Sequence, residues 1–148
     1  MSNKYKMKAE KLENTPLNIY KLETLRFQAY DIKEKFEGYT FYAMALSEGT
    51  MVPYGFFING ELAAGCYVSS AHGTLYIEQL FVHPNIQNSG LRAGRLLLNF
   101  ILIQKEELEK YFGTKFSVSA LEASSDKARA LYEKMGYVSG ELLMRKPI

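Results

Sequence analysis

The stretch that decides the fold is Leu80-Phe81-Val82-His83-Pro84-Asn85-Ile86-Gln87-Asn88-Ser89-Gly90-Leu91-Arg92. Its apolar start is typical of a strand, Pro84 ends that strand, and a helix is expected to begin near Gly90. The first backbone amides of a helix have no acceptor within the helix and lie at the positive end of its dipole. Gly90 has no Cβ to hold an anion away from the backbone. The stretch therefore predicts a pyrophosphate site, although plain packing of a strand against a helix explains these residues equally well.

Upstream of this stretch, the chain predicts three antiparallel strands joined by tight turns. The strands are expected over residues 52–58, 62–69 and 75–82. Asn59-Gly60 is the strongest hairpin signal in the chain, and His72-Gly73 provides a second turn. Alternating lysines over residues 4–9 indicate either an edge strand or a solvated tail.

Helices and further strands are predicted on both sides of this meander. Thr15 and Pro16 form the cap and first position of a helix that extends to Ile32. The other helices are expected over 41–46, from Gly90 to Phe112, and over 126–135, and the other strands over 116–121 and in a closing hairpin within 137–146. The predicted fold class is α/β, more closely α+β: a mixed, mostly antiparallel central sheet of six to seven strands with about four helices on its faces. We expect one domain, 1–148.

Composition excludes several classes of function. The 148 residues include 18 basic and 16 acidic side chains without a concentrated basic run, so no nucleic-acid partner is expected. No apolar run is long enough to cross a bilayer and the amino-terminal stretch is polar, so we expect a cytoplasmic protein with no membrane partner. Cys66 is the only cysteine, which excludes an intramolecular disulfide and a cysteine zinc cluster, and no metal is expected.

Two motifs together resemble those of the GNAT superfamily of acyl-CoA-dependent N-acetyltransferases. The family pattern V-x-P followed by Q/R-x-x-G-x-G/A is similar to Val82-His83-Pro84 followed by Gln87-Asn88-Ser89-Gly90-Leu91-Arg92. The family pattern N-x-x-A-x-x-L-Y-x-K-x-G-F/Y is similar to Ser125-Asp126-Lys127-Ala128-Arg129-Ala130-Leu131-Tyr132-Glu133-Lys134-Met135-Gly136-Tyr137. The chain departs from the family at Arg92, where a small residue is usual, and at Ser125, where an asparagine is usual.

The resemblance implies that acetyl-CoA is the cosubstrate and shows how it would lie. The strand residues Leu80, Phe81 and Val82 would pair with the pantetheine arm, as an extra strand does. The pyrophosphate would lie against the turn formed by Gln87, Asn88, Ser89, Gly90, Leu91 and Arg92. Ser125 would take the place of the family's cofactor-contacting asparagine. The thioester would lie where this strand separates from the strand over 116–121.

The resemblance also implies a catalytic acid, while position suggests a base. Tyr132 matches the family's proton donor to the departing thiolate, although a core tyrosine is the alternative. By alternation Glu78 shares a strand face with Leu80 and Val82, which makes it the candidate base. A solvated carboxylate at Glu78, an ordered water as base, and Glu122 as a weaker candidate remain alternatives.

The predicted activity is transfer of an acetyl group to a primary amine by direct attack in a ternary complex. A small-molecule or amino-acid amine is preferred as acceptor, with a peptide amine as the alternative. Because Arg92 and Ser125 depart from the family pattern, a non-catalytic acyl-CoA sensor is the second hypothesis. An unrelated α/β module with another phosphate ligand is the third. A homodimer is compatible with the resemblance.

Overall fold

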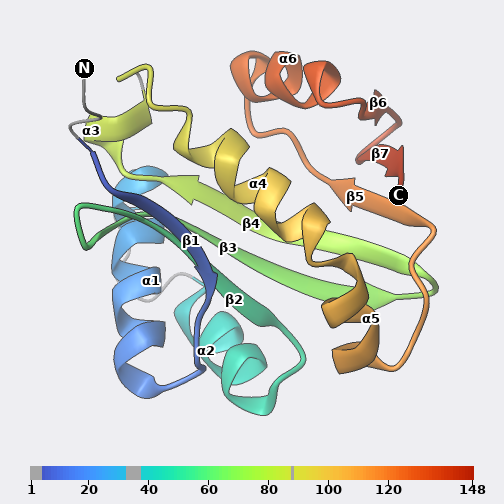
Figure 1. The fold of residues 1–148 in the computed structure, drawn as a ribbon, viewed down its shortest axis with the longest axis horizontal. Helices are drawn as coiled ribbons and strands as arrows, with labels where there is room; N and C mark the ends of the chain where they lie inside the picture. The colour runs from blue at the N-terminus through green and yellow to red at the C-terminus, as the bar shows by residue number, and fades with distance from the viewer. Residues whose placement is uncertain (1–4, 33–37, 88) are drawn as a thin grey trace.

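The computed structural model describes residues 5–32, 38–87 and 89–148 of the chain. The strands of this part form one sheet in the order β1-β2-β3-β4-β5-β7-β6 (Figure 1). They are β1 (Met7–Lys11), β2 (Val52–Ile58), β3 (Glu61–Ala71), β4 (Thr74–Val82), β5 (Val118–Leu121), β6 (Val138–Ser139) and β7 (Met144–Pro147). The helices are α1 (Pro16–Ala29), α2 (Tyr39–Glu48), α3 (Pro84–Gln87), α4 (Ala93–Ile103), α5 (Lys105–Phe112) and α6 (Asp126–Lys134). The expected mixed sheet is confirmed, and among the strands of the described residues only β4 and β5 pair in parallel.

The two predicted hairpin turns are confirmed by their backbone angles. Asn59 and Gly60 have φ values of 53° and 84°, and His72 and Gly73 have φ values of 52° and 74°. Two successive residues with positive φ give the tight turn whose twist matches that of the flanking strands. The Asn59 side chain also accepts a 2.9 Å hydrogen bond from the Lys6 amide, which ties the start of β1 to this turn. Strand β1 stands at the end of the strand order and pairs with β2, so the edge-strand reading is confirmed over Met7–Lys11.

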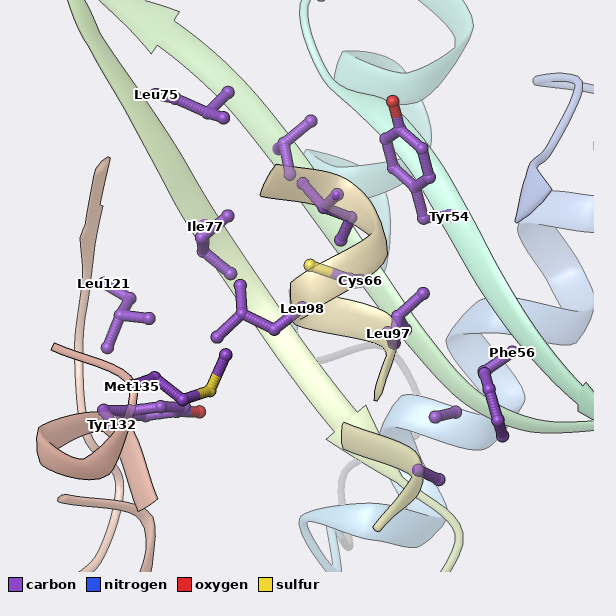
Figure 2. Close-up of a cluster of buried hydrophobic side chains, with 14 of the residues drawn as sticks. Tyr54, Phe56, Cys66, Leu75, Ile77, Leu97, Leu98, Leu121, Tyr132 and Met135 are labelled. Atoms are coloured by element: carbon purple, nitrogen blue, oxygen red, sulfur yellow. The ribbon is translucent and has the colours of Figure 1, made fainter. Parts of the chain in front are cut away.

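Each face of the sheet has its own hydrophobic cluster. Helices α1 and α2 cover one face, where Leu22 and Leu46 are fully buried with Tyr67 of β3. Helix α4 crosses the opposite face, and its Leu97 and Leu98 pack in the larger cluster (Figures 1 and 2). Each buried leucine side chain contributes about 2 kcal/mol to folding. None of the described helices has the length and apolar character needed to cross a bilayer.

The long helix predicted from Gly90 to Phe112 is two helices with a later start. Arg92 has a φ of 54°, so it lies outside the right-handed helix, and α4 begins at Ala93. At Gln104 the backbone amide is shared between the carbonyls of Phe100 and Ile101, and α5 follows at once. Apolar residues at helical spacing continue through this junction, so periodicity alone does not reveal the break. The loop expected before Gly90 also contains one helical turn, α3.

Strand β4 is longer than its parallel neighbour β5. The two strands pair only from Thr74 to Ile77 of β4, opposite Val118 to Leu121. Beyond Ile77 the described residues place no strand along this side of β4, which runs on to Val82. The sheet therefore opens between β4 and β5 at the point where both sequence motifs begin.

Candidate active site

The backbone of β4 presents polar groups to this opening. The amide of His83 donates a 2.8 Å hydrogen bond to the Ala63 carbonyl in β3. Because the amide and carbonyl of one residue point to the same side and successive residues alternate, those of Leu80 and Val82 point away from β3. The end of β4 is therefore an unpaired sheet edge with its donors and acceptors turned toward the opening.

Side chains donate hydrogen bonds to both carbonyls of this edge, those of Leu80 and Val82. The Tyr30 hydroxyl, just after α1, donates a 2.7 Å hydrogen bond to the Leu80 carbonyl. The side-chain amide of Gln87 donates a 2.9 Å hydrogen bond to the Val82 carbonyl. Leu80 and Val82 thus link α1 and α3 to the same edge.

The pairing of β4 with β3 slips by one residue at Glu78. Tyr67 of β3 lies opposite Gln79, whereas the next residue, Val68, lies opposite Ile77. Glu78 is therefore the extra residue of a β-bulge, a feature that re-aims side chains and interrupts strand pairing.

The bulge changes the direction of the Glu78 side chain. Its carboxylate accepts a 2.7 Å hydrogen bond from the Ser69 hydroxyl. Ser69 is two residues after Tyr67, whose side chain packs under α1 and α2, so the carboxylate lies toward that face. Leu80 and Val82 pack against the opposite cluster. Glu78 therefore does not share a strand face with Leu80 and Val82 as predicted, because the bulge interrupts the alternation of side chains along β4.

A pocket of about 250 Å³ lies where β4 and β5 separate. Its lining comes from the end of α1, from β4 and β5, from the segment after β5 and from α6: Tyr30, just after α1, and Ile77, Glu78, Gln79, Leu80, Leu121, Glu122, Ser124 and Tyr132. The candidate base, the candidate acid and the unpaired edge of β4 therefore meet in one pocket, although they are far apart in sequence.

Tyr132 is the most deeply buried polar side chain of this pocket. It is 7% exposed, and Figure 2 shows it beside Met135 and Leu121. Among the described residues its hydroxyl has no hydrogen-bond partner, and none of their fully enclosed side-chain polar atoms lacks one, so this hydroxyl reaches the pocket space. Burial, followed by the neighbouring Tyr30 hydroxyl, raises the pKa of Tyr132 well above its usual value. Tyr132 is therefore a neutral phenol at physiological pH, and its hydroxyl can donate a hydrogen bond into the pocket.

The turn between β4 and α4 is closed by its own hydrogen bonds. The Ser89 hydroxyl donates to the Ile86 carbonyl at 2.7 Å and accepts from the Leu91 amide at 3.3 Å. Gly90 has a φ of 82°, and a Cβ added there would contact nothing within 4 Å. The backbone at this turn is thus open to an approaching ligand.

The start of α4 adds backbone donors next to this turn. The first hydrogen bond of the helix runs from the Leu96 amide to the Arg92 carbonyl, so the amides of Ala93, Gly94 and Arg95 precede it. These are the amides that a helix leaves without internal acceptors. No side chain caps them within the described residues. Together with the positive end of the helix dipole, they favour an anion at this position.

A buried ion pair fixes α1 against the sheet beside the pocket. The guanidinium of Arg26 donates to both carboxylate oxygens of Glu23, at 2.7 and 2.9 Å. The Tyr67 hydroxyl donates to the same carboxylate at 2.7 Å, and Arg26 lies 4.6 Å from the centre of the Tyr42 ring. Glu23 and Tyr67 are 1% and 0% exposed. This network holds the helix that ends beside Tyr30.

Comparison with known proteins decides the family. A family model described as "Acetyltransferase (GNAT) domain" matches residues 41–139, which is more than half of the chain and includes both motifs. The chain belongs to the GNAT acetyltransferase family. A sequence comparison with curated proteins found no match.

Solved structures with the GNAT fold cover nearly the whole chain. The ribosomal-protein-S18-alanine N-acetyltransferase from Escherichia coli has a TM-score of 0.74 and 21% identity over 97% of this chain and 94% of that one. PaiA N-acetyltransferase from Thermoplasma acidophilum, in complex with coenzyme A, has a TM-score of 0.70 and 14% identity over 97% and 99%. AtaTR bound with AcCoA has a TM-score of 0.69 and 14% identity over 95% and 92%. At these identities the likeness establishes the fold.

Several residues expected to contact the cofactor in this GNAT chain have other partners or lie elsewhere. The Phe81 ring is buried on the α1 face, so only its backbone belongs to the strand edge. The Ser125 hydroxyl accepts a 3.1 Å hydrogen bond from the Ala128 amide as the cap of α6. Asn88 lies outside the described residues.

Sequence reasoning assigned no site role to four described lining residues: Ile77, Gln79, Leu121 and Ser124. Tyr30, which the sequence offered only as one of several aromatic residues for the wall of the acceptor pocket, lines it and also bonds to the β4 edge. No GNAT motif includes Tyr30, and its place follows from how α1 packs on β3 and β4. Gln79 and Ser124 are next to predicted residues in sequence, but the bulge and the opening of the sheet decide that they line the pocket.

Proposed function

We propose that this GNAT acetyltransferase transfers an acetyl group from acetyl-CoA directly to a primary amine in a ternary complex. The observation that carries the proposal is the Tyr132 hydroxyl, a buried and protonated donor that reaches a pocket beside the unpaired β4 edge. The same pocket contains the Glu78 carboxylate. An acid, a base and a strand edge in one place are what acyl transfer to an amine requires.

The residues at the opening fit the chemistry of acetyl-CoA. Its pyrophosphate would lie against the turn of Gln87, Ser89 and Gly90 and the free amides at the start of α4. Its amide-containing arm would follow the edge at Leu80 and Val82, which requires Tyr30 and Gln87 to release the two carbonyls. Further proposed contacts to acetyl-CoA come from Asn88, Leu91, Arg92 and Ser125. The Leu91 amide has a competing partner in Ser89.

The chemical step needs no covalent enzyme intermediate. The amine nitrogen attacks the thioester carbonyl carbon and forms the new C–N bond. Glu78 takes the proton that the nitrogen loses, directly or through water, and an amide of the β4 edge stabilises the oxyanion. The C–S bond then breaks, and Tyr132 gives its proton to the departing thiolate. The products are the N-acetylated amine and coenzyme A with a free thiol.

The decisive experiment is Tyr132→Phe, followed by thiol release from acetyl-CoA with a panel of amines. We expect kcat to fall by about a hundredfold or more, because a positioned general acid contributes about 10² to 10⁴. Acetyl-CoA affinity should change little. The matched control is Tyr111→Phe, which removes a hydroxyl bonded to the Gly49 carbonyl outside the pocket. Equal kcat in the wild type and Tyr132→Phe would refute the role of Tyr132.

A non-catalytic acyl-CoA sensor is the second candidate. It is favoured by the Ser125 hydroxyl, which is already used as a helix cap, and by the left-handed conformation of Arg92 at the start of α4. A sensor would bind acetyl-CoA without releasing thiol with any amine, so the same assay separates the two functions. A homodimer and a cytoplasmic location stay predictions from the sequence.

A further inference from the structure

The pocket differs in charge from the chain as a whole. The chain has 18 basic and 16 acidic residues, for a net charge of +2. The described lining of the pocket contains two carboxylates, Glu78 and Glu122, and no lysine, arginine or histidine. A ligand that enters the pocket therefore meets a local excess of negative charge.

This negative charge is not neutralised by the ion pairs of the described residues. Neither Glu78 nor Glu122 takes part in one, and the hydrogen bond to Glu78 comes from the neutral Ser69 hydroxyl. The buried cation nearby, Arg26, binds both carboxylate oxygens of Glu23 and does not line the pocket. The field inside the pocket therefore favours cations.

A second observation marks this pocket as a ligand site. The Tyr132 side chain is 7% exposed, and its hydroxyl reaches the pocket without a hydrogen-bond partner among the described residues. A hydroxyl that opens into a pocket can donate a hydrogen bond to a ligand that enters there. The acidic lining and this donor therefore belong to the same binding space.

We propose that the acceptor is an amine with a second positive charge and no carboxylate, a diamine in the simplest case, and that Glu122 selects it. This inference rests on the proposed acetyl transfer. Glu78 deprotonates the attacking nitrogen, while Glu122 at the exposed rim attracts the distant ammonium group. An amino acid brings a carboxylate into the same field and is repelled by both side chains.

The test uses three acceptors of equal length and different charge: butane-1,4-diamine, butylamine and 4-aminobutanoate. Thiol release from acetyl-CoA gives kcat/KM for each. We expect the diamine to exceed 4-aminobutanoate by about tenfold or more, with butylamine between them, because about 1.4 kcal/mol corresponds to a factor of ten. Added salt should reduce the preference, since part of the interaction is exposed to solvent.

The variant Glu122→Gln isolates the selecting charge. We expect the ratio of kcat/KM for diamine over butylamine to fall about three- to fivefold, mainly through a higher KM for the diamine. The matched control is Glu106→Gln, which removes an equal charge from an exposed position of α5 and should leave the ratio unchanged.

The outcomes separate this inference from the proposed function. Turnover of 4-aminobutanoate, or of a peptide that begins with alanine, as fast as the diamine would overturn the inference and leave acetyl transfer intact. Acetyl-CoA binding without turnover of the diamine would also overturn it. Failure to bind acetyl-CoA would refute the proposed function itself.

Discussion

The two halves of the site are held in place in different ways. The pocket half, which contains Tyr30, Glu78 and Tyr132, rests on contacts between segments far apart in sequence, such as the hydrogen bond from Tyr30 to Leu80 and the buried one from Tyr67 to Glu23. The turn half, residues 86, 87 and 89–92, is held by hydrogen bonds between neighbours such as Ser89 and Ile86, and these residues are mostly exposed.

Because the two halves are held together differently, substitutions in them should have different effects. Long-range packing fixes the positions of the proposed acid and base, on which proton transfer depends. The turn, whose hydrogen bonds are local, offers backbone amides to the proposed pyrophosphate. Changes in the buried contacts should therefore affect folding and catalysis strongly, whereas changes in the turn should affect acetyl-CoA affinity and have small effects on stability.

The largest expected effect comes from breaking the anchor of the pocket half with Glu23→Ala. This change leaves the Arg26 charge buried without its bidentate partner and removes the acceptor of the Tyr67 hydroxyl. The free energy of unfolding should fall by about 3 to 5 kcal/mol, as for other buried pairs that lose one member. Denaturation by urea measures this loss.

The matched control for the anchor is an ion pair on the surface. Glu107→Ala removes the partner of Lys110 at 3.8 Å, where the two side chains are 71% and 77% exposed. The expected change in the free energy of unfolding is below about 0.5 kcal/mol. A loss below about 1 kcal/mol for Glu23→Ala would show that the buried pair does not anchor α1.

The sequence revealed the features that neighbouring residues determine. Thr15 and Ser125 cap their helices as predicted, with their hydroxyl oxygens bonded to the amides of Asn18 and Ala128. Asn59-Gly60 forms the predicted hairpin turn. Each of these features depends on side-chain and backbone chemistry within three or four residues, which is why a local pattern is enough to predict it.

The remaining features depend on partners that the sequence does not place. The bulge at Glu78 exists because β3 and β4 slip between Tyr67 and Val68, and no local pattern in β4 reveals it. Tyr30 reaches the Leu80 carbonyl only because α1 packs across the sheet. The later start of α4 follows from the conformation of Arg92, which departs from the family pattern.

Alkaline pH should lower the stability of the fold because the buried Tyr137, whose ring packs against Tyr132, must ionise. Burial raises the pKa of Tyr137 to about 12, compared with about 10 for a free phenol. The stability from this group is complete below pH 10 and is lost as the pH rises from 10 to 12, since the unfolded chain releases the proton first. The slope is about 1.4 kcal/mol per pH unit for each such group. Urea denaturation between pH 8 and 11 measures it.

The variant Tyr137→Phe tests this assignment. At pH 8 it should cost about 1 to 2 kcal/mol, because the buried Ser119 hydroxyl loses its 2.8 Å partner. Above pH 10 the wild type loses the contribution of Tyr137 and the variant does not, so the gap between them should narrow. A gap that stays constant up to pH 11 would contradict the raised pKa of Tyr137.

The smallest expected effect lies in the turn half, at Arg92. Its φ of 54° strains any residue with a Cβ, by about 1 kcal/mol, and Arg92 is an exposed residue that directly precedes the free amides of α4. Arg92→Gln removes the charge and keeps the strain, whereas Arg92→Gly removes both. We expect Arg92→Gly to be more stable than Arg92→Gln by about 0.5 to 1 kcal/mol, since the flexibility of glycine in the unfolded chain offsets part of the relief.

Acetyl-CoA affinity separates the two roles of Arg92. If the charge of Arg92 attracts the pyrophosphate, Arg92→Gln and Arg92→Gly should both bind acetyl-CoA about two- to fivefold more weakly than the wild type at low salt. At high salt their affinities should approach that of the wild type. Calorimetry measures these affinities. Equal stability of the two variants would mean that the turn stores no strain at Arg92. Unchanged affinity would mean that the backbone amides hold the anion without help from this side chain.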